Sequence, residues 1–375
     1  MAKRKKKKFR PFKALISFAF VFVVLFAAYV AFKSGSDLSW ENIERTVRNI
    51  FAGVGYTDSF EYGSSENALF ADLSGGLLKL TESEVTAYSV SGEEMYSENL
   101  RLERPSLHAS NGRAAVYGVG GSEVRVFDRA GLIYELNTDE KVISVSISAG
   151  GRLALCTKES GWSGSVTAYD ISGTAVYKWY CASGYPSVAA VSADGSEMAV
   201  LIIGSEGSNI VFLSFDSETE KARFKLDGKL ILDIRFMDNG NLSAVTETGL
   251  IMVKPNGESA GTLEFEERYL YSYSLESGDI NVLAAADFIG ANMSIVTTGE
   301  TGEKIGELES EFDVISISAC KNRLAVLYKN TAVIYKKDMS PEVTLVLSEP
   351  AMSVLMRSDG TALIMGSHSA NILKP

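Results

Sequence analysis

The residue types that most often carry catalysis or bind metals are scarce in this chain of 375 residues. It contains two histidines, His108 and His368, and three cysteines, Cys156, Cys181 and Cys320. Neither histidine has a partner at metal-ligand spacing, and a structural zinc site needs about four ligands. The cysteines form no CxxC motif and are too few and odd in number for a disulfide framework. The sequence therefore predicts no metal site and places both histidines at the surface or at strand ends.

Known catalytic motifs are missing as well. The sequence has no G-x-S-x-G, H-E-x-x-H, P-loop or EF-hand calcium loop. Residues 264–267 (EFEE) could be read as paired glycosidase carboxylates, but acidic clusters arise by chance in a chain with 47 Asp and Glu. We therefore predict no catalytic residue and no cofactor.

One segment has the length and composition of a membrane span. Residues 14–32, from Ala14 to Phe32, contain no charge, and Ser17 and Tyr29 are the polar members. Nineteen helical residues cover about 28 Å, close to the ~30 Å hydrocarbon core of a bilayer. A cleavable signal peptide has a shorter apolar region of about 7–15 residues, so an uncleaved anchor is the better interpretation.

The charges around this segment predict its orientation. Residues 1–13 hold eight Lys or Arg and no acid, whereas Lys33 is followed by Asp37 and Glu41. The positive-inside rule therefore places the N-terminus in the cytosol and the rest of the chain outside, with the Lys-rich tail facing anionic lipid.

The chain outside the Lys-rich tail is strongly acidic. Removing the eight basic residues of the tail from the total of 36 leaves 28 against 47 acidic ones, a formal charge of −19. So acidic a domain excludes nucleic acid as a partner, because phosphate binding depends on Lys and Arg.

A short helix is predicted between the anchor and the rest of the chain. Apolar residues from Trp40 to Phe51 recur at spacings of three and four, which indicates an amphipathic helix over residues 38–52. It packs either under the domain that follows or against a membrane or partner, and we favour the first.

The remainder of the chain reads as a repeat built from strands alone. Turn pairs recur from Gly75-Gly76 to Asp359-Gly360, and their second members are separated by 36, 39, 44, 45, 39, 43 and 38 residues. Within one repeat, residues 142–148 (VISVSIS) alternate bulky and small side chains, and a Gly-Gly turn and three further β-rich runs follow. This period is typical of a β-propeller with four strands per blade. We predict an all-β fold of eight four-stranded blades, with seven as the alternative.

The repeats resemble those of WD40-like and quinoprotein-like propellers. Residues 168–173 (AYDISG) with Trp179 are similar to the quinoprotein motif, but the motif is one residue short and occurs once, so its quinone cofactor and calcium are not implied. Tail, anchor, helix and acidic propeller together resemble an uncharacterised bacterial family of membrane-anchored propeller proteins. The resemblance covers the whole chain and implies no known activity.

The domain boundaries follow from these elements. We assign residues 1–13 to a cytosolic tail, 14–32 to the transmembrane helix, 33–55 to a linker with the amphipathic helix, and 56–375 to the propeller. The eighth repeat has three strands, so residues 58–62 (DSFEY) are predicted to add its outer strand and close the ring.

The architecture predicts a single-pass membrane protein whose extracytoplasmic propeller binds or scaffolds an envelope protein. The alternative is an envelope hydrolase or lyase that acts on carbohydrate or peptide through carboxylates in the central channel. Loops between second and third strands are predicted to be long at residues 118–122, 159–165 and 204–209. Trp162 in the second of these loops and Tyr185 in the link after it are the predicted partner-binding residues, because exposed aromatics often anchor interfaces.

Overall fold

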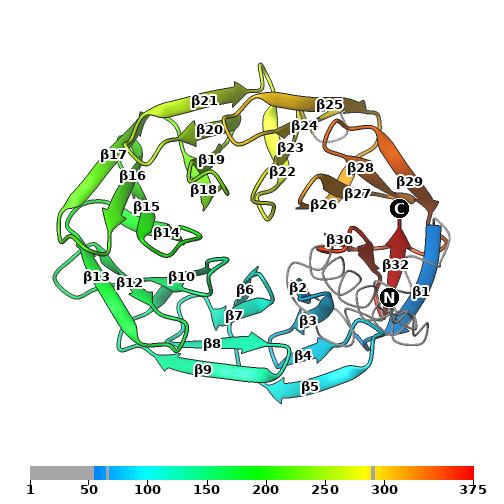
Figure 1. The fold of residues 1–375 in the computed structure, drawn as a ribbon, viewed down its shortest axis with the longest axis horizontal. Helices are drawn as coiled ribbons and strands as arrows, with labels where there is room; N and C mark the ends of the chain where they lie inside the picture. The colour runs from blue at the N-terminus through cyan, green and yellow to red at the C-terminus, as the bar shows by residue number, and fades with distance from the viewer. Residues whose placement is uncertain (1–54, 65–66, 289–291) are drawn as a thin grey trace, which may run out of the picture.

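The computed structural model describes residues 55–64, 67–288 and 292–375. These residues form 32 strands in eight four-stranded antiparallel sheets, arranged around a central axis (Figure 1). The eight-bladed propeller is therefore confirmed, and the seven-bladed alternative is wrong. The predicted tail, anchor and amphipathic helix lie outside the described residues, and within the described ranges no helix is long and apolar enough to cross a membrane.

Blades 1 to 7 are meanders of four consecutive strands that run from the channel to the outer rim (Figure 1). The first three blades comprise, in order, β2 (Leu69–Leu73), β3 (Gly76–Leu80), β4 (Glu84–Tyr88) and β5 (Glu94–Asn99); β6 (Pro105–Ser110), β7 (Arg113–Gly118), β8 (Glu123–Asp128) and β9 (Gly131–Asn137); and β10 (Val142–Ile147), β11 (Leu153–Thr157), β12 (Gly164–Tyr169) and β13 (Ala175–Cys181).

The next four blades repeat this pattern. They comprise β14 (Tyr185–Val191), β15 (Glu197–Gly204), β16 (Gly207–Ser214) and β17 (Glu220–Asp227); β18 (Ile231–Phe236), β19 (Leu242–Thr246), β20 (Gly249–Val253) and β21 (Ser259–Glu264); β22 (Tyr269–Ser274), β23 (Asn281–Ala286), β24 (Met293–Thr298) and β25 (Lys304–Ser310); and β26 (Val314–Cys320), β27 (Arg323–Tyr328), β28 (Thr331–Lys336) and β29 (Pro341–Val346).

The eighth blade joins the two ends of the described chain. It contains β30 (Ser353–Met356), β31 (Ala362–Met365), β32 (Ser369–Lys374) and, outermost, β1 (Gly55–Glu61). The backbone of β1 pairs antiparallel with β32, so that Gly55 lies opposite Lys374 and Glu61 opposite Ser369. The predicted closure by the N-terminal strand is confirmed, and no edge of β32 is left open.

The connections divide the propeller into two faces. We call the face with the first-to-second and third-to-fourth turns of each blade the turn face. The opposite face, with the second-to-third loops and the links between blades, is the link face. All eight turn pairs of the repeat join first to second strands on the turn face. At one of them Asn111 and Gly112 both have positive φ, 46° and 76°, as a two-residue hairpin turn requires.

The third-to-fourth turns show why aspartate follows the third strand so often. The Asp170 carboxylate accepts hydrogen bonds from the backbone amides of Ser172 and Thr174, both at 2.9 Å. Asp128 likewise accepts one from the amide of Ala130 at 2.7 Å. These carboxylates stabilise turns and need no functional explanation.

The core consists of apolar layers between neighbouring blades. Second strands such as β11 are buried along their whole length because both of their faces pack on another sheet. Side chains of one inner strand also accept hydrogen bonds from backbone amides of the inner strand of the next blade. Ser316 and Ser318 accept hydrogen bonds from the amides of Val354 and Met356 at 3.2 and 3.0 Å. The alternation of serine with bulky residues in the sequence therefore has a structural cause, since unpaired inner-edge amides are costly.

One predicted loop is wrong. Residues 204–209 do not form a long loop, because β15 and β16 extend their pairing to Gly204 and Gly207 and leave a two-residue turn. The other two predicted loops are present, at residues 119–122 and 158–163.

Candidate functional site

The predicted partner-binding residues lie on the link face between blades 3 and 4. Trp162 is 49% exposed and its ring lies 5.4 Å from that of Tyr180, while Tyr185 is 70% exposed at the start of β14. The loop that carries Trp162 packs closely on the next blade, since a Cβ at Gly164 would lie 2.7 Å from the ring of Pro186. Tyr180, which sequence reasoning missed, therefore belongs to the same aromatic cluster.

This cluster is held in place by an ion pair beside it. The Lys178 ammonium lies 4.9 Å from the centre of the Tyr180 ring and 2.9 Å from a carboxylate oxygen of Glu159. The hydrogen bonds of Lys178 and Ser165 lower the pKa of Glu159. Both partners are on the surface, so the pair orients the aromatic rings and contributes little to stability.

Exposed apolar side chains gather on this same face all around the ring. Of the fifteen large hydrophobic residues that are exposed in the described ranges, twelve lie in link-face loops or within three residues of a strand end on that face. They are Leu69, Trp162, Tyr180, Tyr185, Leu232, Tyr269, Tyr271, Phe288, Phe312, Ile315, Val346 and Met352. The other three, Leu132, Ile171 and Val176, lie at the turn face.

Part of this apolar set surrounds the link-face mouth of the channel. The inner strands of blades 3 to 7 each have a register shift next to their first or second residue, which leaves one residue unpaired. Three of these residues, Leu232, Tyr271 and Ile315, are 39%, 50% and 44% exposed. A β-bulge redirects a side chain, and here it brings apolar groups to the channel entrance.

The channel interior is polar. His108 lies in the middle of β6, not at the surface or at a strand end as expected, and its Nδ1 accepts a hydrogen bond from the amide of Ile147 at 3.1 Å. Burial, and then the charge of Arg235, lower the pKa of His108 to about 3. The ring is therefore neutral near pH 7, with its proton on Nε2.

Two carboxylates accompany Arg235: Asp233 from the same strand, β18, and Glu276 from the next blade. Burial raises the pKa of Asp233, although hydrogen bonds from the Ile234 amide and the Tyr273 hydroxyl act in the opposite direction. Glu276 accepts a hydrogen bond from Ser318 at 3.1 Å. Burial also lowers the pKa of Arg235, and the charges of Glu276 and Asp233 only partly compensate for it.

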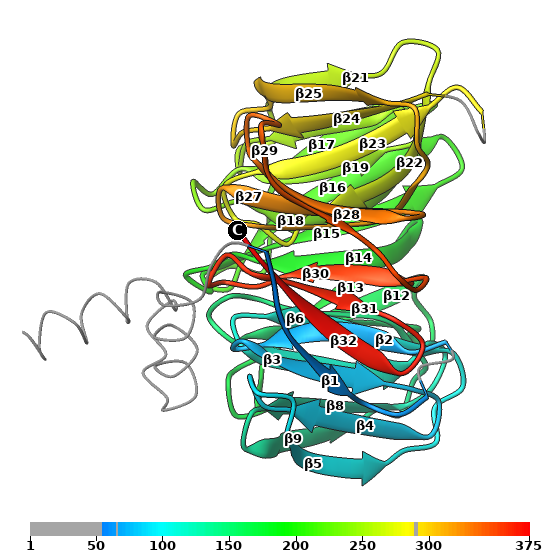
Figure 2. The ribbon, with the colours of Figure 1, turned by 90° about the vertical axis from the view of Figure 1, so that its right-hand side faces the viewer.

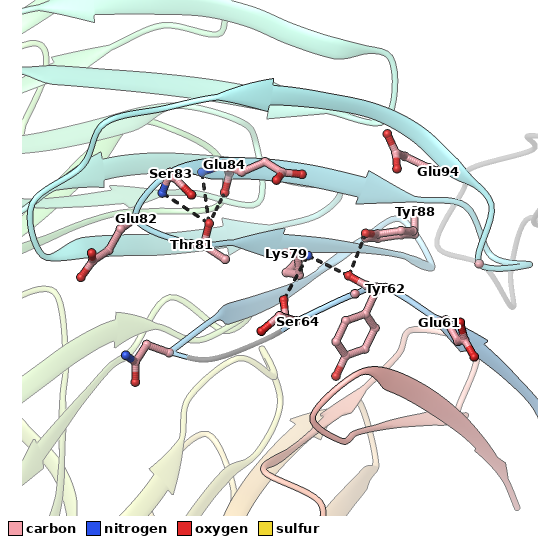
Figure 3. A pocket seen from close by; sticks show the side chains of 13 residues that line it. Glu61, Tyr62, Ser64, Lys79, Thr81, Glu82, Ser83, Glu84, Tyr88 and Glu94 are labelled. Atoms are coloured by element: carbon pink, nitrogen blue, oxygen red, sulfur yellow. Dashed lines mark hydrogen bonds between the residues drawn. The ribbon is translucent and has the colours of Figure 1, made fainter.

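A pocket of about 860 Å³ lies at the seam between blades 8 and 1 (Figure 3). Lys79 of β3, which is 6% exposed, extends to the chain that follows β1 and donates to the carbonyl oxygens of Tyr62 at 2.8 Å and Ser64 at 3.4 Å. The Tyr88 hydroxyl also donates to the Tyr62 carbonyl. Lys79 thus holds the link between the closing strand and the first blade.

Lysine is unusual at this position of the fold. In each of the other blades, the corresponding second-strand side chain that faces the preceding blade is apolar: Val116, Leu155, Val200, Ala244, Leu283, Val326 and Ile364. The seam also has the smallest layer among the described side chains, with eight buried hydrophobic residues. The signal in the sequence is a lysine inside the leucine-rich run of residues 77–80.

The carboxylates around the seam pocket are mostly at its rim. Glu61, Glu82 and Glu94 line it (Figure 3), and the pKa of Glu84 is lowered by hydrogen bonds from Thr86 and Ser97. The seam lysine is occupied by carbonyl oxygens, so the pocket provides a structural clasp and no acid–base pair. In the described ranges no group of three or more His, Cys, Asp or Glu is arranged to hold a metal ion.

All three cysteines are free and lie in or beside the apolar layers. Cys156 lies in an apolar layer between blades, and Cys320 packs beside another. Burial raises the pKa of each of these two thiols to about 12. Both therefore pack as small hydrophobic residues.

Comparison with known proteins agrees with this fold. Residues 46–374 match a family of unknown function, DUF5711. The chain belongs to this family. No curated protein matches the sequence.

Two solved structures resemble the family member described here. BamB from Moraxella catarrhalis superposes with a TM-score of 0.56 at 14% identity, covering 86% of this chain and 98% of that one. The C-terminal WD40 domain of Sif2 gives 0.58 at 13% identity, covering 86% and 96%. At these identities the likeness concerns the propeller fold, and the resemblance to WD40-like propellers and to an uncharacterised propeller family is confirmed at that level.

Proposed function

We propose that this protein is a membrane-anchored propeller that binds an envelope protein through its link face. The observation that carries the proposal is the uneven distribution of exposed apolar residues, twelve of fifteen of which lie on that face. Large exposed apolar surface marks interaction sites. Both faces are rich in acidic residues, so charge does not distinguish them, whereas apolar area does.

The position of the chain entry supports an orientation for this face. β1 begins with Gly55 at the turn face, on the same side as the C-terminus (Figure 2, left). Twenty-two residues, 33–54, separate the predicted anchor at residues 14–32 from Gly55. Because this tether joins the propeller at the turn face, we infer that the link face points away from the membrane. The Lys-rich tail then contacts lipid in the cytosolic leaflet, and the propeller lies outside the cell membrane.

The aromatic cluster on the link face supplies suitable anchors for a protein partner. Trp162, Tyr180 and Tyr185 present rigid, amphipathic rings at one place on the link face. Tryptophan and tyrosine are enriched among the residues that dominate binding energy, and replacing one by alanine often costs about 2 kcal/mol or more. The remaining apolar residues around the channel mouth extend the contact.

The hydrolase alternative requires two converging carboxyls with raised pKa in the channel. A raised pKa occurs at Asp233, but this carboxyl accepts hydrogen bonds from Ile234 and Tyr273 and faces Arg235. Glu276 is engaged by Ser318. The channel geometry therefore favours binding over hydrolysis.

The experiment that tests the proposal replaces Trp162 and Tyr185 together by alanine in the full-length protein. Chemical crosslinking in intact cells is expected to lose its adducts to a partner, while the melting temperature stays unchanged. Ile171→Ala with Val176→Ala is the matched control, because both residues are exposed on the turn face of blade 3. Adducts that survive in the aromatic double variant, or disappear equally in the control, would contradict the proposal.

A further inference from the structure

The turn-face end of the central channel contains a second feature that the proposed function does not use. Two cavities of about 390 and 290 Å³ lie there, and both are lined by Ser110, Ala149, Arg235 and Glu276. The inner strands of all eight blades surround this axis (Figure 1). Pockets of about 300–1,000 Å³ hold ligands up to drug size, so this space suits a small molecule.

Arg235 provides hydrogen-bond donors in this space. Its guanidinium makes no hydrogen bond and no ion pair within 4 Å among the described residues, although it is half-buried. Burial outweighs the two neighbouring carboxylates in its effect on the Arg235 pKa. A guanidinium has five N–H donors in a planar fork that matches a carboxylate.

Two further groups line this space, His108 in the smaller cavity and Glu276 in both. His108 uses Nδ1 to accept a hydrogen bond from the Ile147 amide, which leaves its Nε2–H as a donor. Glu276 accepts the Ser318 hydroxyl with one oxygen, and its other oxygen has no hydrogen bond within the described ranges. This part of the channel therefore offers the donors of Arg235 and His108 together with carboxylate acceptors that include Glu276.

The charges select one class of ligand. A simple anion would be attracted by Arg235 but repelled by Glu276 and Asp233. A simple cation would be attracted by the two carboxylates but repelled by Arg235. A guanidinium and a carboxylate that interact by charge without touching leave room for a molecule with both charges. The hydroxyls of Ser110, Ser144 and Ser148 add further polar lining.

We propose that this part of the channel binds a small zwitterion in which a carboxylate lies next to an ammonium group, as in a free amino acid. Arg235 and the Nε2–H of His108 hold the carboxylate, and Glu276 holds the ammonium. The site is independent of the link face and of the partner that binds there. A free amino acid and the terminus of a short peptide share part of this chemistry, and the test separates them.

The test uses the full-length protein in detergent and isothermal titration calorimetry. The probes are the free L-amino acids, the matching carboxylic acids without the amine, and dipeptides. We expect at least one amino acid to bind more tightly than its amine-free analogue and than its dipeptides. Arg235→Gln should weaken that binding by about tenfold to a hundredfold, the range of a charge-assisted hydrogen bond. Glu276→Gln should remove the preference for the amine.

The controls separate this site from folding and from the link face. Arg223→Gln removes an arginine on the outer strand of blade 4 and should leave affinity unchanged, as should the Trp162 and Tyr185 replacements. If Arg235→Gln does not fold, Arg235→Lys keeps the charge but not the fork, and it too should lose at least about tenfold. Tighter binding of dipeptides would replace the free amino acid by a peptide terminus. Absence of binding by every probe, or wild-type affinity in the folded Arg235 variants, would overturn the proposal.

Discussion

Replacing Lys79 at the seam between blades 8 and 1 should destabilise the closed ring by an amount that depends on the substitute. The Lys79 ammonium donates to the Tyr62 carbonyl at 2.8 Å, and its second contact, to Ser64 at 3.4 Å, is longer than a good hydrogen bond. One hydrogen bond to a charged group is worth about 1.5–3 kcal/mol. Alanine also removes three buried methylenes, worth about 0.8 kcal/mol each.

These contributions give a graded expectation. Lys79→Ala should lower the free energy of unfolding by about 4–5 kcal/mol. Lys79→Met keeps the apolar stem and should lose at most about 3 kcal/mol. With an unfolding entropy of about 2.1 cal/mol/K per residue over about 320 residues, the melting temperature should fall by about 6–7 °C for alanine and by no more than about 4.5 °C for methionine.

The assay is thermal unfolding of the full-length protein combined with hydrogen exchange of the β1 and β32 amides. Val116→Ala is the control, because Val116 occupies the same position in blade 2. It should lose stability without raising exchange in β1, whereas Lys79→Ala should raise it. A methionine variant that is more stable than the wild type and shows unchanged exchange in β1 would refute the claim that Lys79 holds β1 to the first blade.

Three further predictions follow from the fold and its charges. Deletion of residues 56–62 should expose the edge of β32 and cause aggregation or a large fall in melting temperature, and unchanged stability would count against closure by β1. Protease added to spheroplasts should remove the chain after Phe32 and spare the Lys-rich tail; full protection until lysis would show the opposite topology. Because the pKa of His108 is depressed to about 3 from about 6.5 in the unfolded chain, the unfolded state binds a proton first as pH falls. Stability should therefore drop below pH 6.5, by at most about 1.4 kcal/mol per unit from this group, and His108→Asn, which keeps an acceptor for Ile147, should reduce that acid sensitivity in pH-dependent denaturant unfolding.

The sequence predicts this fold well because propeller turns have strict local requirements. In seven of the eight blades at least one member of the turn pair has positive φ, as at Asn111-Gly112. The residues that tolerate this conformation therefore recur in the sequence with the period of the blades. Closure by the strand before Tyr62 follows from counting strands in the last repeat. The loop at residues 204–209 was mispredicted because Gly and Ser indicate a turn without fixing where pairing stops.

The sequence alone predicts only part of the candidate sites. Trp162 and Tyr185 could be placed on one face because strand order fixes which loops share a face. The contribution of Tyr180 depends on a ring contact across two strands, and the channel residues His108 and Arg235 come from blades 2 and 5. Which side chains meet across the axis depends on blade number and register, which a single repeat does not encode.

The most direct test of the central claim compares the two faces in intact cells. A photo-crosslinking amino acid is placed singly at Tyr185, Phe288 or Phe312 on the link face, and at Leu132, Ile171 or Val176 on the turn face, all of which are exposed. The account predicts adducts to a common envelope protein from the link-face positions and none to that protein from the turn face. Equal adducts from both faces, or adducts to that protein from the turn face alone, would contradict it.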